Sequence, residues 1–184
     1  MKNITRILLA TVLAGAASAP ALADAPYGAV DIGQTTGSNL CTGAVGCKDT
    51  AGALRVALGY QFVPQMGAEI SYGAYGKASL GTLGGTVMGD WKASGFALSG
   101  IGALPLGNGF SLTAKLGIAS TKLDISGTGR SATSTNLAYG VGARYDFNRD
   151  VAMRLQYETL GDVGDSNTGT TKLNLLSAGV VMRF

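Results

Sequence analysis

The chain has 184 residues, of which 46% are hydrophobic, 14% are charged and 29 are glycine. This length suits one domain with a targeting segment, and the composition excludes both a disordered chain and a collagen-like one. Basic residues outnumber acidic residues by only 14 to 11, and no basic run is present. The sequence therefore does not predict a nucleic-acid partner.

Residues 1–23 have the pattern of a secretory signal peptide. Lys2 and Arg6 precede an apolar stretch over 7–19, and a small-x-small cleavage motif follows at 21–23. We therefore expect export of the chain, with a mature domain that begins after the motif.

A transmembrane anchor is the alternative interpretation of this segment. Its apolar stretch is shorter than the roughly 20 residues that a spanning helix needs, and Pro20 interrupts it. The pattern favours a signal peptide over 1–23 and a mature domain over 24–184, with cleavage after Ala25 as a second possibility.

The two cysteines, Cys41 and Cys47, are separated by five residues. An exported chain passes through an oxidising compartment, so a local disulfide is expected. A metal site is the alternative, but it needs more Cys, His or carboxylate ligands than this segment offers. The sequence predicts neither a metal nor a cofactor.

The mature sequence consists of segments with period-two alternation, separated by turn residues. Eight strands are predicted, at 27–34, 51–62, 66–76, 91–104, 110–123, 136–147, 151–160 and 173–184. Their connections alternate between short turns, at 63–65, 105–109 and 148–150, and longer polar loops, at 35–50, 77–90, 124–135 and 161–172. Such alternation is typical of a transmembrane barrel with tight periplasmic turns and larger outer loops.

The composition of the two faces decides which side of the sheet is apolar. In the second segment, Leu54, Val56 and Leu58 share one face, whereas Arg55 and Gln61 lie on the other with small residues. A soluble barrel or sandwich, the alternative, would pack the large apolar face inward. The small and charged face cannot form such a core, so the pattern favours an all-β fold, an eight-stranded antiparallel up-and-down transmembrane β-barrel.

Aromatic residues gather at the predicted strand ends, as in the interfacial girdles of membrane barrels. The last segment has apolar residues at alternate positions and ends on an aromatic residue. We interpret Val180, Met182 and Phe184 as a C-terminal assembly signal.

Several motifs resemble the membrane domain of the OmpA-like outer-membrane proteins, and together they span nearly the whole mature chain. They lie at 59–62 with Pro64 and 67–69, at 91–95, at 112–117, at 154–157 and at 176–184. The resemblance implies a bacterial outer-membrane location, contact with lipid and lipopolysaccharide, and delivery by periplasmic chaperones to the barrel assembly machinery. It does not include the peptidoglycan-binding domain of longer members, so it does not imply attachment to the cell wall. We expect a monomer.

Alternation directs a set of charged side chains into the lumen, with Glu158 and Arg183 as further candidates. The predicted network comprises Asp31, Arg55, Glu69, Lys115, Arg144, Asp146 and Arg154. The resemblance implies interior ion pairs at Glu69, Lys115 and Arg154. Two departures from the family pattern, Ile101 in place of Lys and Arg144 in place of Glu, imply that the network is rewired here.

The network has two interpretations. Paired charges can simply fill a lumen that is about as wide as its own side chains, or they can form a regulated ion path. In the second case, Glu69→Ala would open a conducting gap.

Histidine is absent from the sequence, which excludes a Ser/His/Asp hydrolase or an imidazole-metal site built from the chain's own residues. The leading hypothesis is a non-enzymatic outer-membrane surface protein whose loops contact host, phage or lipopolysaccharide. A narrow pore for small solutes is the alternative, and a lipid-modifying enzyme is disfavoured.

Overall fold

The computed structural model describes residues 25–37, 49–79, 82–83, 86–87, 90–125, 130–163 and 171–184. Ten strands lie in these ranges. They are β1 (Pro26–Gly37), β2 (Thr50–Val63), β3 (Met66–Ser79), β4 (Thr82–Leu83), β5 (Thr86–Val87), β6 (Asp90–Gly107), β7 (Phe110–Ile125), β8 (Arg130–Asp146), β9 (Val151–Val163) and β10 (Thr171–Arg183). The predicted signal peptide and its cleavage site lie outside the described residues, as do Cys41 and Cys47.

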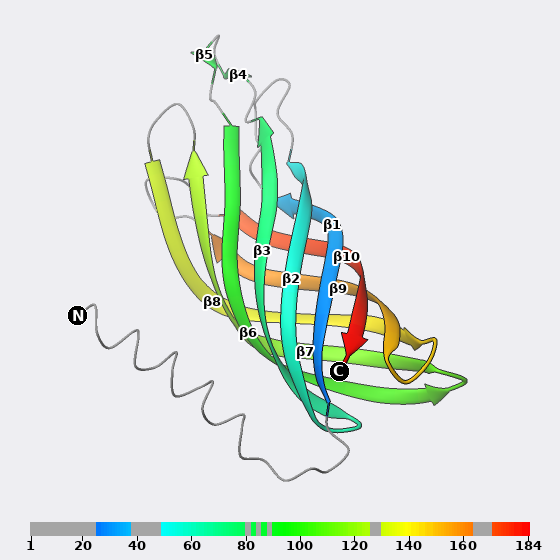
Figure 1. Cartoon of the computed structure of the whole chain (residues 1–184). Helices are drawn as coiled ribbons and strands as arrows, with labels where there is room; N and C mark the ends of the chain where they lie inside the picture. Colours follow the sequence, from blue (N-terminus) through cyan, green and yellow to red (C-terminus); the bar gives the residue numbers. More distant parts are fainter. Residues whose placement is uncertain are drawn as a thin grey trace, which may run out of the picture.

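Eight of the strands form a closed antiparallel barrel in the order β1-β10-β9-β8-β7-β6-β3-β2, and the predicted fold class is confirmed (Figure 1). The first and last strands pair along their length, from Tyr27 opposite Arg183 to Gly37 opposite Leu173. Closure pairs the backbone groups of every barrel strand, as a bilayer requires. Among the described residues, no helix is long and apolar enough to cross a membrane.

The short connections and the start of β1 lie at one end of the barrel, which we call the turn end. The β6–β7 turn there has positive φ at Gly107, Asn108 and Gly109, a conformation that glycine and asparagine adopt at low cost. In the β8–β9 turn, Asn148 Oδ1 accepts hydrogen bonds from the backbone N–H groups of Asp150 and Val151. The opposite end, with the longer connections, is the loop end.

All eight predicted segments overlap barrel strands, although Phe147 and Phe184 lie just beyond the ends of β8 and β10. The strands extend further toward the loop end, and β6 also extends into the predicted turn, as far as Gly107. β8 begins at Arg130 instead of 136, and the predicted connection 77–90 contains the small β4–β5 ribbon (Figure 1). The added part of β8, residues 130–135, lacks large apolar residues, and Thr135 Oγ1 donates to Ser120 Oγ across the β7–β8 pair at 3.2 Å. Alternation of apolar residues does not predict such strand ends.

The predicted inversion of the two faces is present in the structure. In β2, Val56 and Leu58 are 48% and 66% exposed, whereas the neighbouring Arg55, on the other face of the same strand, is only 2% exposed. The same contrast runs around the barrel wall at this level, where large apolar side chains form the outer surface and charged side chains lie in the lumen.

Glycine on the inner face makes room for large neighbouring side chains. A Cβ atom on Gly59 would overlap with the Tyr27 ring, and one on Gly179 would overlap with the Asp31 carboxylate. The glycine-rich inner face therefore allows a narrow lumen to hold aromatic and charged groups.

Candidate functional site

Six buried charges in the middle of the lumen form a closed ring in which acidic and basic residues alternate. β1, β2, β3 and β7 each supply one member, and β9 supplies two. The charged ring runs through Asp31, Arg55, Glu158, Lys115, Glu69 and Arg154 and returns to Asp31. Each cation contacts two carboxylates and each carboxylate contacts two cations.

Arg154 makes the most extensive contacts in the ring. Its Nε and Nη2 atoms donate to the two oxygens of Asp31 at 2.7 and 2.6 Å, in the bidentate geometry that a guanidinium prefers. Its Nη1 atom donates to Glu69 Oε2 at 2.5 Å. Arg154 therefore joins the carboxylates of β1 and β3 across the lumen.

Lys115 and Arg55 close the other side of the ring. Lys115 Nζ lies 2.7 Å from Glu69 Oε1 and 2.8 Å from Glu158 Oε1. Arg55 Nε lies 2.9 Å from Asp31 Oδ2, and its Nη1 contacts Glu158 Oε2. Arg154 and Glu158 of β9 contact residues of β3 and β2. The ring therefore connects strands on opposite sides of the barrel.

Neutral groups hydrogen-bond to the charged ring. Tyr27 donates its hydroxyl proton to Glu69 Oε2 at 3.2 Å, and Arg55 Nη2 donates to Gln156 Oε1 at 2.6 Å. The six ring residues are all at most 8% exposed, so the pairing offsets a large desolvation cost. Three positive and three negative charges leave the ring electrically neutral.

A second, smaller group of charges lies at the turn end, separate from the ring. Arg144 donates to Asp146 Oδ1 through Nε at 3.0 Å and Nη2 at 2.8 Å. Arg183 contacts the same oxygen and also donates to the Arg149 carbonyl at 2.5 Å. These side chains are partly exposed, so this rim cluster is cheaper to hydrate than the ring.

Apolar side chains fill the lumen on the loop side of the ring. In β3, β7 and β9, an apolar residue lies nearer the loop end than the ring residue of the same strand. The buried apolar layer comprises Ala51, Tyr75, Ala93, Ala97, Ala119, Leu123, Ala138, Leu160, Leu173 and Leu175.

On the turn side of the ring the lumen contains cavities. A mouth of about 750 Å³ is lined by Arg144, Asp146 and Arg183 among others. Two small cavities of about 30 Å³ each also touch Arg144 and Tyr27, and one of them reaches Arg154 and Gln156 of the ring neighbourhood. Each is large enough for water.

The structure divides the predicted lumen network between two places. Asp31, Arg55, Glu69, Lys115 and Arg154 meet in the ring, whereas Arg144 and Asp146 lie in the rim cluster. Alternation directs Glu158 and Arg183 inward as well, and Glu158 is a full member of the ring.

The apolar layer escaped sequence analysis. Leu173 and Leu175 lie on the same face of β10 as the inward-facing Ser177. Their position on that face could have predicted apolar residues in the lumen. Near the loop end of β10, Leu173 and Leu175 lie inside while Lys172 and Asn174 lie on the other face, so the rule that places the apolar face outward does not reveal that the lumen changes from charged to apolar there.

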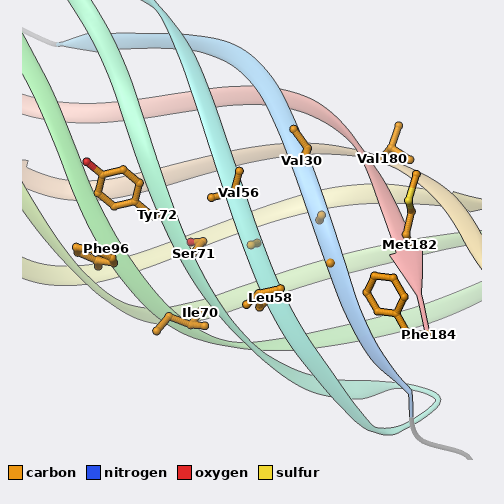
Figure 2. Close-up of a pocket in the computed structure, with 13 residues that line it drawn as sticks. Val30, Val56, Leu58, Ile70, Ser71, Tyr72, Phe96, Val180, Met182 and Phe184 are labelled. Carbon is orange, nitrogen blue, oxygen red and sulfur yellow. The ribbon is translucent and has the colours of Figure 1, made fainter. Parts of the chain in front are cut away.

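The predicted assembly-signal residues Val180, Met182 and Phe184 lie on the outer wall. With Val30, Val56 and Leu58 they line a shallow apolar groove of about 640 Å³ (Figure 2). The groove arises because Gly28 lies between Met182 and Leu58 in one cross-strand row. Such a surface suits contact with lipid acyl chains.

Comparison with known proteins identifies the family. The family model described as the OmpA-like transmembrane domain matches residues 21–184. The chain belongs to this family. It is therefore an OmpA-like protein of the bacterial outer membrane, as the resemblance implied.

Curated relatives of this OmpA-like protein include outer membrane protein A from Shigella flexneri and from Salmonella typhi. They are 31% and 32% identical over 135 residues. Each match covers 68% of this chain and 38% of the relative, so the chain corresponds to well under half of the relatives' length.

Solved structures share the OmpA-like fold at low sequence identity. Neisserial surface protein A has a TM-score of 0.65 at 17% identity, and the match covers 86% of this chain and 97% of that one. The N-terminal barrel domain of Pseudomonas aeruginosa OprF has a TM-score of 0.56 at 14% identity, over 86% and 97% of the two chains. Yersinia pestis Ail, in complex with the heparin analogue sucrose octasulfate, has a TM-score of 0.53 at 18% identity, over 86% and 99%.

The chemistry of the lumen is that of paired, buried charges. Within the described residues, no group of three or more His, Cys, Asp or Glu side chains is placed to hold a metal ion. Each ring carboxylate accepts from two cations, and an acid or base for catalysis would need to exchange a proton with a substrate.

Proposed function

We propose that this OmpA-like protein is a non-enzymatic surface protein whose sealed barrel holds its loops at the outer face of the membrane. The observation that carries the proposal is the filled lumen, in which the charged ring and the apolar layer occupy successive levels. If the barrel neither conducts nor catalyses, the protein acts through its loops or through its presence in the membrane.

The proposal includes the partners expected from the resemblance. Short turns face the periplasm in barrels of this kind, which would direct the four predicted loops, at 35–50, 77–90, 124–135 and 161–172, toward lipopolysaccharide, phage or a host surface. The complex of Ail with sucrose octasulfate supports the idea that a similar barrel can present a contact surface. Delivery by chaperones to the assembly machinery, a monomeric state and removal of residues 1–23 are further parts of the proposal.

Liposome swelling tests the sealed barrel. Purified protein in liposomes is expected to give no sugar flux above that of protein-free vesicles, whereas a general porin reconstituted in parallel gives rapid swelling. Measurable flux through the wild-type protein would contradict the proposal.

Loop replacement tests the surface role. A variant with short glycine-serine linkers in place of residues 38–48, 80–89, 126–129 and 164–170 is expected to fold, as seen by heat-modifiable gel mobility, but to lose binding of cells to immobilised lipopolysaccharide. Equal binding by cells that carry the wild-type protein, the loop variant or neither would count against lipopolysaccharide contact.

A narrow pore remains the second candidate, favoured by the cavities that lead from the turn end to Arg154. In this case the ring is the gate, and Glu69→Ala creates conductance by removing one carboxylate. Planar-bilayer recordings of that variant distinguish the two functions.

A further inference from the structure

The lumen is asymmetric along its axis. Between the turn end and the ring lie the mouth and two water-sized cavities, bordered by Arg144, Thr113 and Gln156 among others. Between the ring and the loop end lies the apolar layer, whose largest members are at most 2% exposed. The turn side therefore offers water a route toward the ring, whereas the described residues on the loop side present buried apolar side chains.

We propose that the barrier to ions and solutes is the apolar layer around Leu123 and Leu175, and that the charged ring is not the gate. This inference rests on the proposed sealed barrel and states which residues seal it. The periplasmic half of the lumen is then a hydrated blind cavity that ends at the layer.

The position of the layer supports this assignment. Tyr75 lies beyond Glu69 in β3, and Leu123 lies beyond Lys115 in β7. Leu175 of β10 is paired with Glu158 of β9 at the boundary between the two levels. An ion that passed the ring would next meet apolar side chains from several strands.

The layer is also anchored to the barrel wall. The Thr35 hydroxyl lies 3.2 Å from the Ala51 carbonyl and 3.1 Å from the Tyr75 carbonyl, within donating distance of both. This contact connects β1, β2 and β3 at the level of the layer. The backbone that carries Tyr75 is thereby tied to β1.

The physical difference between the two levels is the cost of hydration. Polar and charged side chains replace part of the hydration shell of a passing ion, whereas a narrow apolar constriction excludes ions by dewetting. The ring is neutral and lies beside water-sized cavities. In the layer, the Thr35 and Thr121 hydroxyls lie among the apolar side chains. These neutral groups compensate an ion less than the charged ring does, so the layer presents the higher barrier.

Ring closure makes the charged level tolerant of single deletions. If Glu69 is removed, Lys115 still contacts Glu158 and Arg154 still contacts Asp31. Loss of one carboxylate converts the ring into a chain of paired charges instead of freeing a cation. The apolar layer remains in place above it.

The test compares three variants in planar bilayers: Leu175→Ser, Leu176→Ser and Glu69→Ala. Leu175 is buried in the layer and Leu176 lies on the outer wall of the same strand, 52% exposed, so the two serine substitutions differ only in the face that they alter. Leu175→Ser is expected to raise the open fraction about tenfold or more, because a buried leucine contributes strongly to the closed packing. Leu176→Ser and Glu69→Ala are expected to stay at the wild-type level.

Leu123→Ala provides a second opening variant, and Leu175→Met provides a control that preserves side-chain volume and is expected to stay closed. Heat-modifiable mobility identifies the folded fraction of each. Conductance in Glu69→Ala together with closed Leu175→Ser and Leu123→Ala barrels would overturn the inference while leaving the wild type sealed. Conductance in the wild type would instead overturn the proposed function.

Discussion

Gly179 of β10 shows how single residues shape the lumen. It lies opposite Asp31 of β1 and Arg154 of β9 in the strand register, and these two side chains meet in the ring. A side chain at Gly179 would overlap with the Asp31 carboxylate and would disturb its bidentate contact with Arg154.

Gly179→Ala is therefore expected to lower the free energy of unfolding by about 1–3 kcal/mol, the usual cost of overpacking. Urea titration in detergent micelles, followed by heat-modifiable mobility, measures the change. Gly102→Ala is the matched control because no heavy atom lies within 4 Å of its added Cβ. Equal stability of the two variants would show that the space beside Asp31 is not needed.

Ring neutrality leads to a second prediction at the residue scale. Glu69→Ala is expected to cost about 3 kcal/mol, at the low end for a broken buried pair, because both cations that it contacted keep another carboxylate. Adding Lys115→Met restores neutrality. The double variant should be destabilised by less than the sum of the two single variants, with a coupling of about 1 kcal/mol or more.

The same urea titrations of both single variants and the double variant form the cycle. Strictly additive losses would mean that the ring members act independently. The cycle therefore measures the energetic coupling between ring members, which the distances between them do not give.

At the scale of elements, alternation predicts the eight barrel strands because outward apolar residues are regular across the membrane-spanning parts. It also directs Asp31, Arg55, Glu69, Lys115 and Arg154 to one lumen. It could not predict that Arg144 would lie apart from them, because strand tilt and register determine the level of each side chain along the axis. The polar start of β8, residues 130–135, was missed because both of its faces lack large apolar residues.

The β1–β10 pair closes the barrel, and its turn end carries the aromatic terminus. The Phe184 backbone N–H donates to the Pro26 carbonyl at 3.0 Å, while the residue as a whole is 79% exposed on the outer wall. The side chain therefore adds little to closure itself.

If Phe184 is an assembly signal, Phe184→Ser should reduce the folded protein in the outer membrane several-fold while leaving the refolding of purified chain in detergent nearly unchanged. Quantitative immunoblots of unheated membrane fractions give the first value. Phe147→Ser, another exposed aromatic at the turn end, is the control and should assemble normally. Equal losses for both would indicate a general role of interfacial aromatics.

At the scale of the whole molecule, one wall separates two environments. Its outer surface is apolar and includes the groove beside Gly28 and Phe184, and its interior holds a neutral ring beneath an apolar layer. This inside-out arrangement is stable only where lipid solvates the outside. Membership of the OmpA-like family agrees with that requirement.

Cell fractionation combined with heat-modifiable gel mobility tests this account most directly. We expect the protein in the outer-membrane fraction, and we expect the unheated form to migrate differently from the boiled form because a closed barrel resists unfolding in detergent. Recovery as a soluble periplasmic protein with the same mobility before and after boiling would contradict it.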